Sequence, residues 1–165
     1  MMFTPQGKKL IIIGSLDSRY IKMLIKNGKI NEKELKNKNE KYIMVVVNNS
    51  LPGVDEALVI VGSDRRGTVY GTYELSEQIG VSPWYDWADV SVKKQQNLSI
   101  KPGKYTADEP AVKYRDIFLN DEASCLTTWV HNTYGTNYGD HRFYARVFEL
   151  LLHLRANYLW PAMWS

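Results

Sequence analysis

The polar triplet Asn120-Asp121-Glu122 directly follows an apolar run over residues 112–119. Its amide and carboxylate groups suit acid–base chemistry or the binding of a polar substrate. The run predicts a strand, and α/β enzymes place their chemistry where such strands end. A second interpretation is equally open on these residues alone, because short polar side chains at a strand end also cap the loop or helix that follows.

The two carboxylates of the triplet cannot serve together as the acid and base at one bond. Asp121 and Glu122 are adjacent, and consecutive side chains of a strand point to opposite faces. A reaction that needs carboxyl groups on both sides of one bond would therefore draw its second carboxyl from another element.

A helix and a second strand are expected after the triplet. Asp140 is placed to cap the first turn of the helix. An apolar stripe with spacings of three and four residues defines its buried face: Phe143, Val147, Leu150, Leu151 and Leu154. Tyr158-Leu159-Trp160 then resumes as a strand, and the segment after it carries Trp164 at the same sheet edge as the triplet. The order strand, helix, strand is typical of a parallel sheet built from βα units.

The first two thirds of the chain predict a separate α/β arrangement. Asp17 or Ser18 can cap the first helix and Gly28 ends it, while Ser63 or Asp64 can cap the second and Gly80 ends it. The expected elements are a strand over 10–13, a helix over 20–25, strands over 42–47 and 57–61 with a loop over 48–53 between them, a helix over 68–79, and strand, turn and strand over 98–106.

Three other chemistries find little support in the sequence. The turn over 62–67 lacks the Lys-Ser/Thr pair that a phosphate loop requires. His131 and His141 with Asp140 lack the spacing of a zinc site, so we expect no metal and no cofactor. Cys125 and His131 lie in a segment expected to be a loop, where nothing orients them as nucleophile and base.

Composition narrows the class of protein. The net charge is +3, from 21 basic and 18 acidic residues, which is too mild to indicate a nucleic-acid partner. Most of the basic surplus lies in residues 22–41 and is expected on a solvated face. No apolar run approaches the roughly 20 residues of a membrane span, and residues 1–9 show no signal peptide. The sequence leaves the cellular location open, including secretion of a longer parent protein.

Aromatic residues are abundant, with 5 Trp and 11 Tyr, and they are densest over residues 81–89. Two interpretations stay open for Trp84 and Trp87. They either pack between structural layers or form a wall on which a sugar ring stacks.

Three stretches together resemble glycoside hydrolase family 115, the xylan α-1,2-glucuronidases. They are residues 62–89, the segment 112–129 that includes the triplet, and the segment 148–164 that ends in Asn-Tyr-Leu-Trp-Pro-Ala-Met-Trp. The resemblance implies an enzyme that removes glucuronic acid or its 4-O-methyl ether from xylan by an inverting mechanism. The expected partner is glucuronoxylan or its oligosaccharides, and the resemblance raises a homodimer as the assembly of the parent enzyme.

The resemblance also assigns roles by position. Asp121 matches an active-site aspartate, Asn120 its neighbour in the uronate pocket, and Trp164 an aromatic residue lining that pocket. Glu122 belongs to the same motif and is expected to contact substrate. The chain departs from the family pattern at three positions, which are Asp86 for tryptophan, Asp116 for glycine and Ser124 for proline.

The expected fold class is α/β. By the resemblance, residues 1–108 form an α/β accessory domain, and residues 109–165 begin a (β/α)8 catalytic barrel whose later strands lie beyond the sequence. We expect no turnover from this chain alone, because those strands would supply the second carboxyl group. The alternative is a non-catalytic carbohydrate-binding or interaction module that uses Trp84, Trp87 and Trp164.

Overall fold

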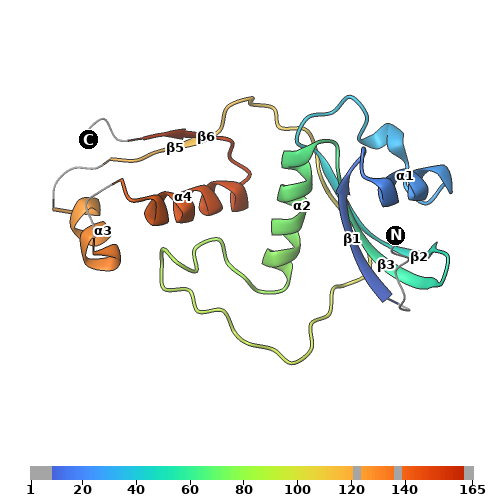
Figure 1. Cartoon of the computed structure of the whole chain (residues 1–165), viewed down its shortest axis with the longest axis horizontal. Helices are drawn as coiled ribbons and strands as arrows, with labels where there is room; N and C mark the ends of the chain where they lie inside the picture. Colours follow the sequence, from blue (N-terminus) through green and yellow to red (C-terminus); the bar gives the residue numbers. More distant parts are fainter. Residues whose placement is uncertain (1–8, 121–123, 136–138, 162–165) are drawn as a thin grey trace, which may run out of the picture. The chain divides into compact units, whose positions relative to one another are not determined.

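The computed structural model describes residues 9–120, 124–135 and 139–161. The chain is a mixed α/β protein that divides into two compact units. Unit 1 comprises residues 1–80 and 94–111, and unit 2 comprises residues 81–93 and 112–165 (Figure 1). No helix within the described ranges is long and apolar enough to cross a membrane.

Unit 1 is built on a four-stranded sheet with the strand order β1-β3-β2-β4. Strand β1 (Lys9–Ser15) pairs in parallel with β3 (Val54–Gly62). Strand β2 (Tyr42–Leu51) is antiparallel to both β3 and β4 (Lys104–Ala107). The central strands β2 and β3 are rich in β-branched residues, which suit a pleated, buried surface.

Two helices cover the two faces of this sheet (Figure 1). Helix α1 (Arg19–Lys26) buries Ile21 and Leu24 in an apolar cluster with alternate residues of β1 and β3. A 3-10 helix, η1 (Glu32–Glu34), follows α1 and leads to the buried Leu35 of the same cluster. Helix α2 (Arg65–Gln78) packs on the opposite face, where Tyr70 is buried.

Glycine allows α2 to lie close to the sheet. A Cβ atom at Gly67 would stand 2.3 Å from the Lys41 carbonyl oxygen, and one at Gly71 would stand 2.8 Å from Ile60 Cγ2. The N-terminus of α2 is fixed by Asp64, whose carboxylate accepts hydrogen bonds from the backbone N–H groups of Gly67 and Glu40, both at 2.8 Å.

Unit 2 contains a two-stranded parallel sheet and two helices. Strand β5 (Asp116–Phe118) pairs with β6 (Tyr158–Trp160), and α3 (Leu126–Tyr134) and α4 (His141–His153) lie between them in the sequence. Five buried residues form the centre of the core: Val130, Phe143, Val147, Leu151 and Ala156.

The structure confirms the expected order of strands and helices in broad outline and corrects several details. Strand β2 continues to Leu51 through a register shift after Asn48, so the loop expected over residues 48–53 is only a tight turn at Pro52-Gly53. Of the two strands expected over residues 98–106, only β4 forms. The strand expected over 112–119 is limited to three residues.

The expected loop at Cys125 and His131 is the start and the body of helix α3. Thr127, Thr128 and Asn132 weaken the helical pattern of this segment because their side chains are neutral or unfavourable inside helices. Packing of Val130 and Leu126 in the core of unit 2 outweighs that preference. The boundary expected between residues 108 and 109 stays a prediction about functional domains.

Candidate active-site edge

The carboxyl ends of β5 and β6 meet at one edge of the small sheet. Phe118 pairs with Trp160, and the Leu119 N–H donates to the Trp160 carbonyl oxygen at 3.1 Å, so the ladder extends one residue past β5. Asn120 follows and is exposed. The other three predicted site residues, Asp121, Glu122 and Trp164, lie outside the described residues. The structure thus places Asn120 at the expected edge.

Side chains of β5 alternate between the core and an uncovered face. Ile117 and Leu119 pack against the core of unit 2, on the side of α4. Phe118 points the opposite way and is 54% exposed, as is Trp160 on β6. The two rings meet edge to face, with centroids 5.6 Å apart. Asn120 follows Phe118 by two residues, so continued alternation would place its side chain on the same face as that of Phe118.

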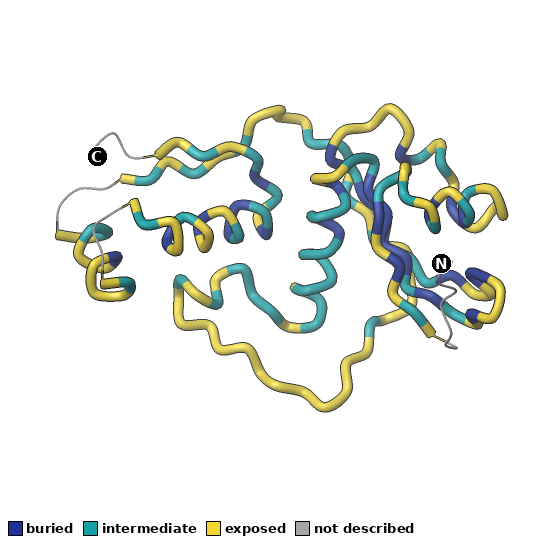
Figure 2. Tube along the Cα trace, viewed as in Figure 1, coloured by how far each residue is buried: buried dark blue, intermediate teal, exposed yellow. Residues whose placement is uncertain are grey.

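An aromatic surface therefore leads toward the edge that carries Asn120. Tyr114 and Tyr158 extend it toward the amino ends of the strands, with ring centroids 6.0 Å apart. In Figure 2, β5 and β6 are coloured as exposed or intermediate, with no buried residue in either strand. Aromatic rings beside polar groups are a combination that suits a sugar, which has apolar ring faces and hydroxyl groups.

The amino ends of the two strands are held together by polar contacts of Asn157 and Arg115. The Asn157 side chain accepts a hydrogen bond from the Arg115 backbone N–H at 3.1 Å and donates to the Lys113 carbonyl oxygen at 2.7 Å. The Arg115 Nε atom donates to the Arg155 carbonyl oxygen at 2.8 Å. These contacts fix the parallel register that brings the carboxyl ends to one edge.

Helix α4, which supports the sheet, is fixed at its first turn by Asp140, as the sequence predicts. The Asp140 carboxylate accepts hydrogen bonds from the Arg142 backbone N–H at 2.7 Å and from the Arg142 Nε atom at 2.9 Å. Hydrogen bonds from the Arg142 side chain and backbone lower the pKa of Asp140 to about 2. The carboxylate is therefore ionised across the neutral range and suited to capping.

A second charged cluster ties the segment 81–93 to α4. Arg146 lies 3.2 Å from Asp86, and its Nη1 atom donates to the Tyr85 hydroxyl oxygen at 3.1 Å and to Glu149 at 2.9 Å. The Tyr85 hydroxyl donates to Glu149 at 3.0 Å. Burial, together with the hydrogen bond to Glu149, raises the pKa of Tyr85 to about 12. This cluster was not predicted from the sequence, and the available signal was the opposite charges of Arg146 and Glu149, three residues apart on α4.

The tryptophans of the segment 81–93 divide between packing and exposure. Trp87 packs against the core of unit 2 and stacks on Trp129, with ring centroids 5.6 Å apart. Trp84 is 43% exposed. Packing therefore accounts for Trp87, while the face of Trp84 is open to solvent.

The described residues offer little support for other chemistries. They contain no group of three His, Cys, Asp or Glu side chains that could hold a metal ion. Cys125 is exposed at the N-cap of α3, and His131 lies six positions further, away from the spacings of three or four that bring helix side chains together.

Comparison with known proteins identifies the family of the chain that carries this edge. Residues 107–165 match the model of glycosyl hydrolase family 115. Among solved structures, the chain is similar to BtGH115A, described as a family GH115 4-O-methyl-alpha-glucuronidase with specificity for decorated arabinogalactans. The sequence identity is 38% and the TM-score 0.75, over 93% of this chain and 20% of that one. The chain belongs to glycosyl hydrolase family 115.

The family 115 chain thus spans about a fifth of the length of the solved relative, since the match covers 20% of it. The part that matches the family model contains β5, β6, α3, α4 and the triplet. No curated protein matches the chain. The family expected from the three sequence stretches is confirmed, and the roles of Asn120, Asp121, Glu122 and Trp164 stay predictions.

Proposed function

We propose that the family 115 chain contributes to a glycoside hydrolase that releases glucuronic acid or its 4-O-methyl ether from a polysaccharide. The match of residues 107–165 to the family model carries this proposal, because that segment includes the triplet and the parallel edge of β5 and β6. The activity is assigned to a polypeptide of the relative's kind, since this chain covers 20% of it.

In this proposal, Asp121 is a catalytic carboxyl group, and Asn120, Glu122 and Trp164 contact the uronate. An inverting glycosidase needs two carboxyl groups about 6.5–9.5 Å apart, with a water molecule between the sugar and the base. Adjacent residues such as Asp121 and Glu122 do not meet that requirement across one bond. The second carboxyl therefore comes from outside the triplet.

We further propose that β5 and β6 are neighbouring strands of a (β/α)8 barrel that begins near residue 109. Three features support this: the two strands are parallel, α4 covers one face, and the other face exposes Phe118 and Trp160. In such barrels the helices pack outside and side chains fill the inside. The exposed aromatic face would then be the inside of the barrel, and dimerisation of the whole enzyme stays an expectation from the resemblance.

The polysaccharide is proposed to be glucuronoxylan, with glucuronic acid on α-1,2 linkages. The solved relative is described as specific for decorated arabinogalactans, and this favours a second candidate. Both polymers present a terminal uronate in this proposal, so release of the acid should be assayed on each in parallel.

The first assay uses the chain alone at high concentration, with Asp121→Ala as a contamination control. We expect no uronic acid release from either polymer, because one carboxyl group cannot complete the reaction. Release that disappears in Asp121→Ala would contradict that expectation. Saturable binding without release, abolished by Trp84→Ala, would instead favour the binding-module alternative.

A chimera tests the hydrolase proposal directly. Residues 9–161 of this chain replace the matching part of the solved relative, which is feasible at 38% identity. We expect the chimera to release uronic acid from at least one polymer, and Asp121→Asn in the chimera to lower kcat by roughly a hundredfold or more. A folded chimera in which Asp121→Asn keeps full activity would overturn the catalytic role of Asp121.

A further inference from the structure

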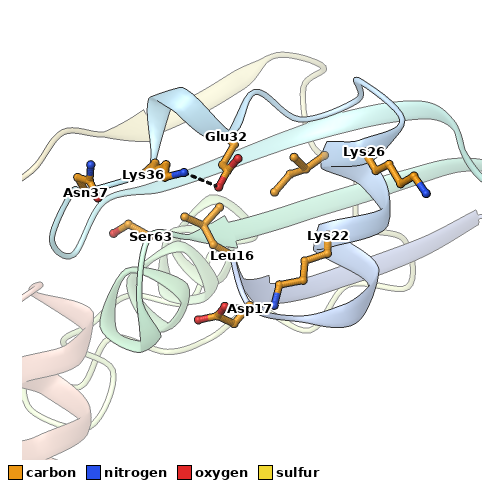
Figure 3. Close-up of a pocket in the computed structure, with 9 residues that line it drawn as sticks. Leu16, Asp17, Lys22, Lys26, Glu32, Lys36, Asn37 and Ser63 are labelled. Atoms are coloured by element: carbon orange, nitrogen blue, oxygen red, sulfur yellow. Dashed lines mark ion pairs between the residues drawn. The ribbon is translucent and has the colours of Figure 1, made fainter.

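A pocket of about 410 Å³ lies in unit 1, at the carboxyl ends of the parallel strands β1 and β3 (Figure 3). Leu16 and Ser63, the first residues after these strands, both line it. The remaining lining residues come from the turn before α1, from α1 itself, and from η1 and the residues after it: Asp17, Lys22, Ile25, Lys26, Glu32, Lys36 and Asn37.

Both the position and the size of the pocket are those of a ligand site. Ligands of open α/β sheets bind in the crevice outside the carboxyl ends of the strands. Pockets for small molecules commonly measure roughly 300 to 1,000 Å³. None of the lining residues belongs to unit 2, so this site is built by unit 1 alone.

Backbone hydrogen bonds hold the walls of the pocket in place. The Leu16 N–H donates to the Gly62 carbonyl oxygen at 3.2 Å, which joins the loops after β1 and β3. The Ser18 N–H donates to the Ser15 carbonyl oxygen at 2.9 Å, and the Lys36 N–H to the Glu32 carbonyl oxygen at 2.9 Å. A ligand therefore meets a wall that is already ordered, which reduces the entropic cost of binding.

The lining combines an apolar patch with alternating donors and acceptors. Leu16 and Ile25 are half-buried and supply the patch. Lys22 Nζ lies 3.2 Å from Asp17 Oδ1, and Lys36 Nζ lies 3.7 Å from Glu32 Oε1. Hydroxyl groups both donate and accept, so a polyhydroxylated ring can use ammonium and carboxylate groups side by side.

The pocket also carries a surplus of positive charge. Its lining residues include three lysines and two carboxylates, which leaves one net positive charge. Figure 3 shows the Lys26 ammonium directed away from the other labelled side chains. Lys22 and Lys36 are paired with Asp17 and Glu32, and the flexible four-carbon stem of Lys26 lets its ammonium turn toward a bound anion.

We propose that this pocket binds an acidic monosaccharide. The ring lies over Leu16 and Ile25, the hydroxyl groups bond to Asp17 and Glu32, and the lysines hold the carboxylate. The choice of a uronic acid as the ligand rests on the proposed function. The charge and shape of the pocket are observed independently of that function. A site of this kind would retain the released acid or an acidic branch of the polymer on unit 1.

The test is a titration of the whole chain with sodium glucuronate at constant ionic strength, followed by amide NMR. We expect saturable shifts centred on the loops after β1, β3 and η1, with a Kd on the order of millimolar because the charges are exposed. Methyl glucoside, which has the ring without the charge, and acetate, which has the charge without the ring, should each bind more weakly.

Charge variants make the test specific. We expect Lys36→Gln to weaken glucuronate binding about threefold, and Glu32→Gln to strengthen it by a similar factor. Lys33→Gln is the matched control, because Lys33 is exposed in η1, carries the same charge and does not line the pocket. Equal weakening in Lys36→Gln and Lys33→Gln, or equal binding of methyl glucoside, would overturn the proposal.

The outcome is separable from that of the proposed function. An active chimera together with no saturable binding here would reject the pocket and leave the hydrolase intact. An inactive, folded chimera together with charge-dependent glucuronate binding would reject the hydrolase proposal and support the pocket.

Discussion

Tyr85, Asp86 and Arg146 show how a few polar side chains attach the segment 81–93 to α4. Asp86 stands where the family resemblance leads us to expect tryptophan. In this chain the carboxylate pairs with Arg146 at 3.2 Å, and Arg146 also contacts Tyr85 and Glu149. The attachment of the segment 81–93 to α4 at this point is thus polar, where the resemblance leads us to expect an apolar side chain.

The cluster gives unit 2 a specific response to alkaline pH. The pKa of Tyr85 rises from 10.0 to about 12 on folding. Between these values the unfolded chain loses the proton while the folded chain keeps it, so unfolding becomes easier as the pH rises. We expect the contribution of Tyr85 to be fully present below pH 10 and to be lost as the pH rises through about 12.

Tyrosinate absorbance and thermal unfolding measure this effect together. Tyr85→Phe should remove one late-ionising tyrosine from the alkaline titration and flatten the fall of Tm above pH 10. Tyr105→Phe is a comparison variant, since its hydroxyl donates to the Lys101 carbonyl oxygen in unit 1. A titration in which Tyr85→Phe and Tyr105→Phe give identical curves would contradict the assignment.

At the scale of elements, the contact between α2 and the sheet depends on glycine. The N-terminal turn of α2 lies so close to Lys41 that a Cβ atom at Gly67 would meet the backbone oxygen at 2.3 Å. A backbone atom cannot move aside as a flexible side chain can. Helix α2 would have to shift away from β2, and the capping hydrogen bond from Gly67 to Asp64 would shift with it.

We therefore expect Gly67→Ala to destabilise unit 1. Alanine favours the helix by about 1 kcal/mol over glycine, but overpacking costs about 3 kcal/mol, so the net loss is about 2 kcal/mol. Urea unfolding followed by circular dichroism measures the change. Glu77→Ala, at an exposed position of the same helix, should alter stability by only a few tenths of a kcal/mol. Equal stability of Gly67→Ala and the unaltered chain would show that α2 can lie further from the sheet.

The elements that the sequence predicted correctly are those with strong local signals. Residues 57–61 of strand β3 form a continuous apolar run, and α2 follows a capping aspartate and ends shortly before Gly80. The signal was weaker where tertiary contacts decide the structure. Asn48 and Asn49 favour a turn, yet pairing with β3 carries β2 past them to Leu51. Helix α3 likewise forms because its apolar residues reach the core of unit 2.

The sequence predicted the position of Asn120 in the candidate site but did not predict the aromatic face beside it. The sequence predicted that Asn120 lies at the sheet edge, because it follows the end of one strand. In a parallel pair, the carboxyl end of the partner strand lies beside it. Only the structure shows that Phe118 and Trp160 meet on an uncovered face, since cross-strand register depends on Asn157 and Arg115. The pocket of unit 1 was invisible in the sequence because it joins residues from four separate segments.

At the scale of the whole molecule, the two units differ in how completely they are enclosed. Unit 1 has a four-stranded sheet with a helix on each face. Unit 2 has two strands of three residues each, and one face of that sheet exposes Phe118 and Trp160. Sheets of two strands are marginally stable unless further elements cover them. We therefore expect unit 2 to be locally less stable than unit 1 in this chain.

This contrast predicts unequal hydrogen exchange within one chain. We expect the amides of Val45 and Val59, in the central strands of unit 1, to exchange about a hundredfold or more slowly than those of Ile117 and Leu159. If the uncovered face is the inside of a barrel, the chimera should slow exchange at Ile117 and Leu159 and leave Val45 and Val59 unchanged. Protection of all four amides to the same degree in the chain alone would mean that unit 2 is already enclosed, and the barrel proposal would lose its main structural support.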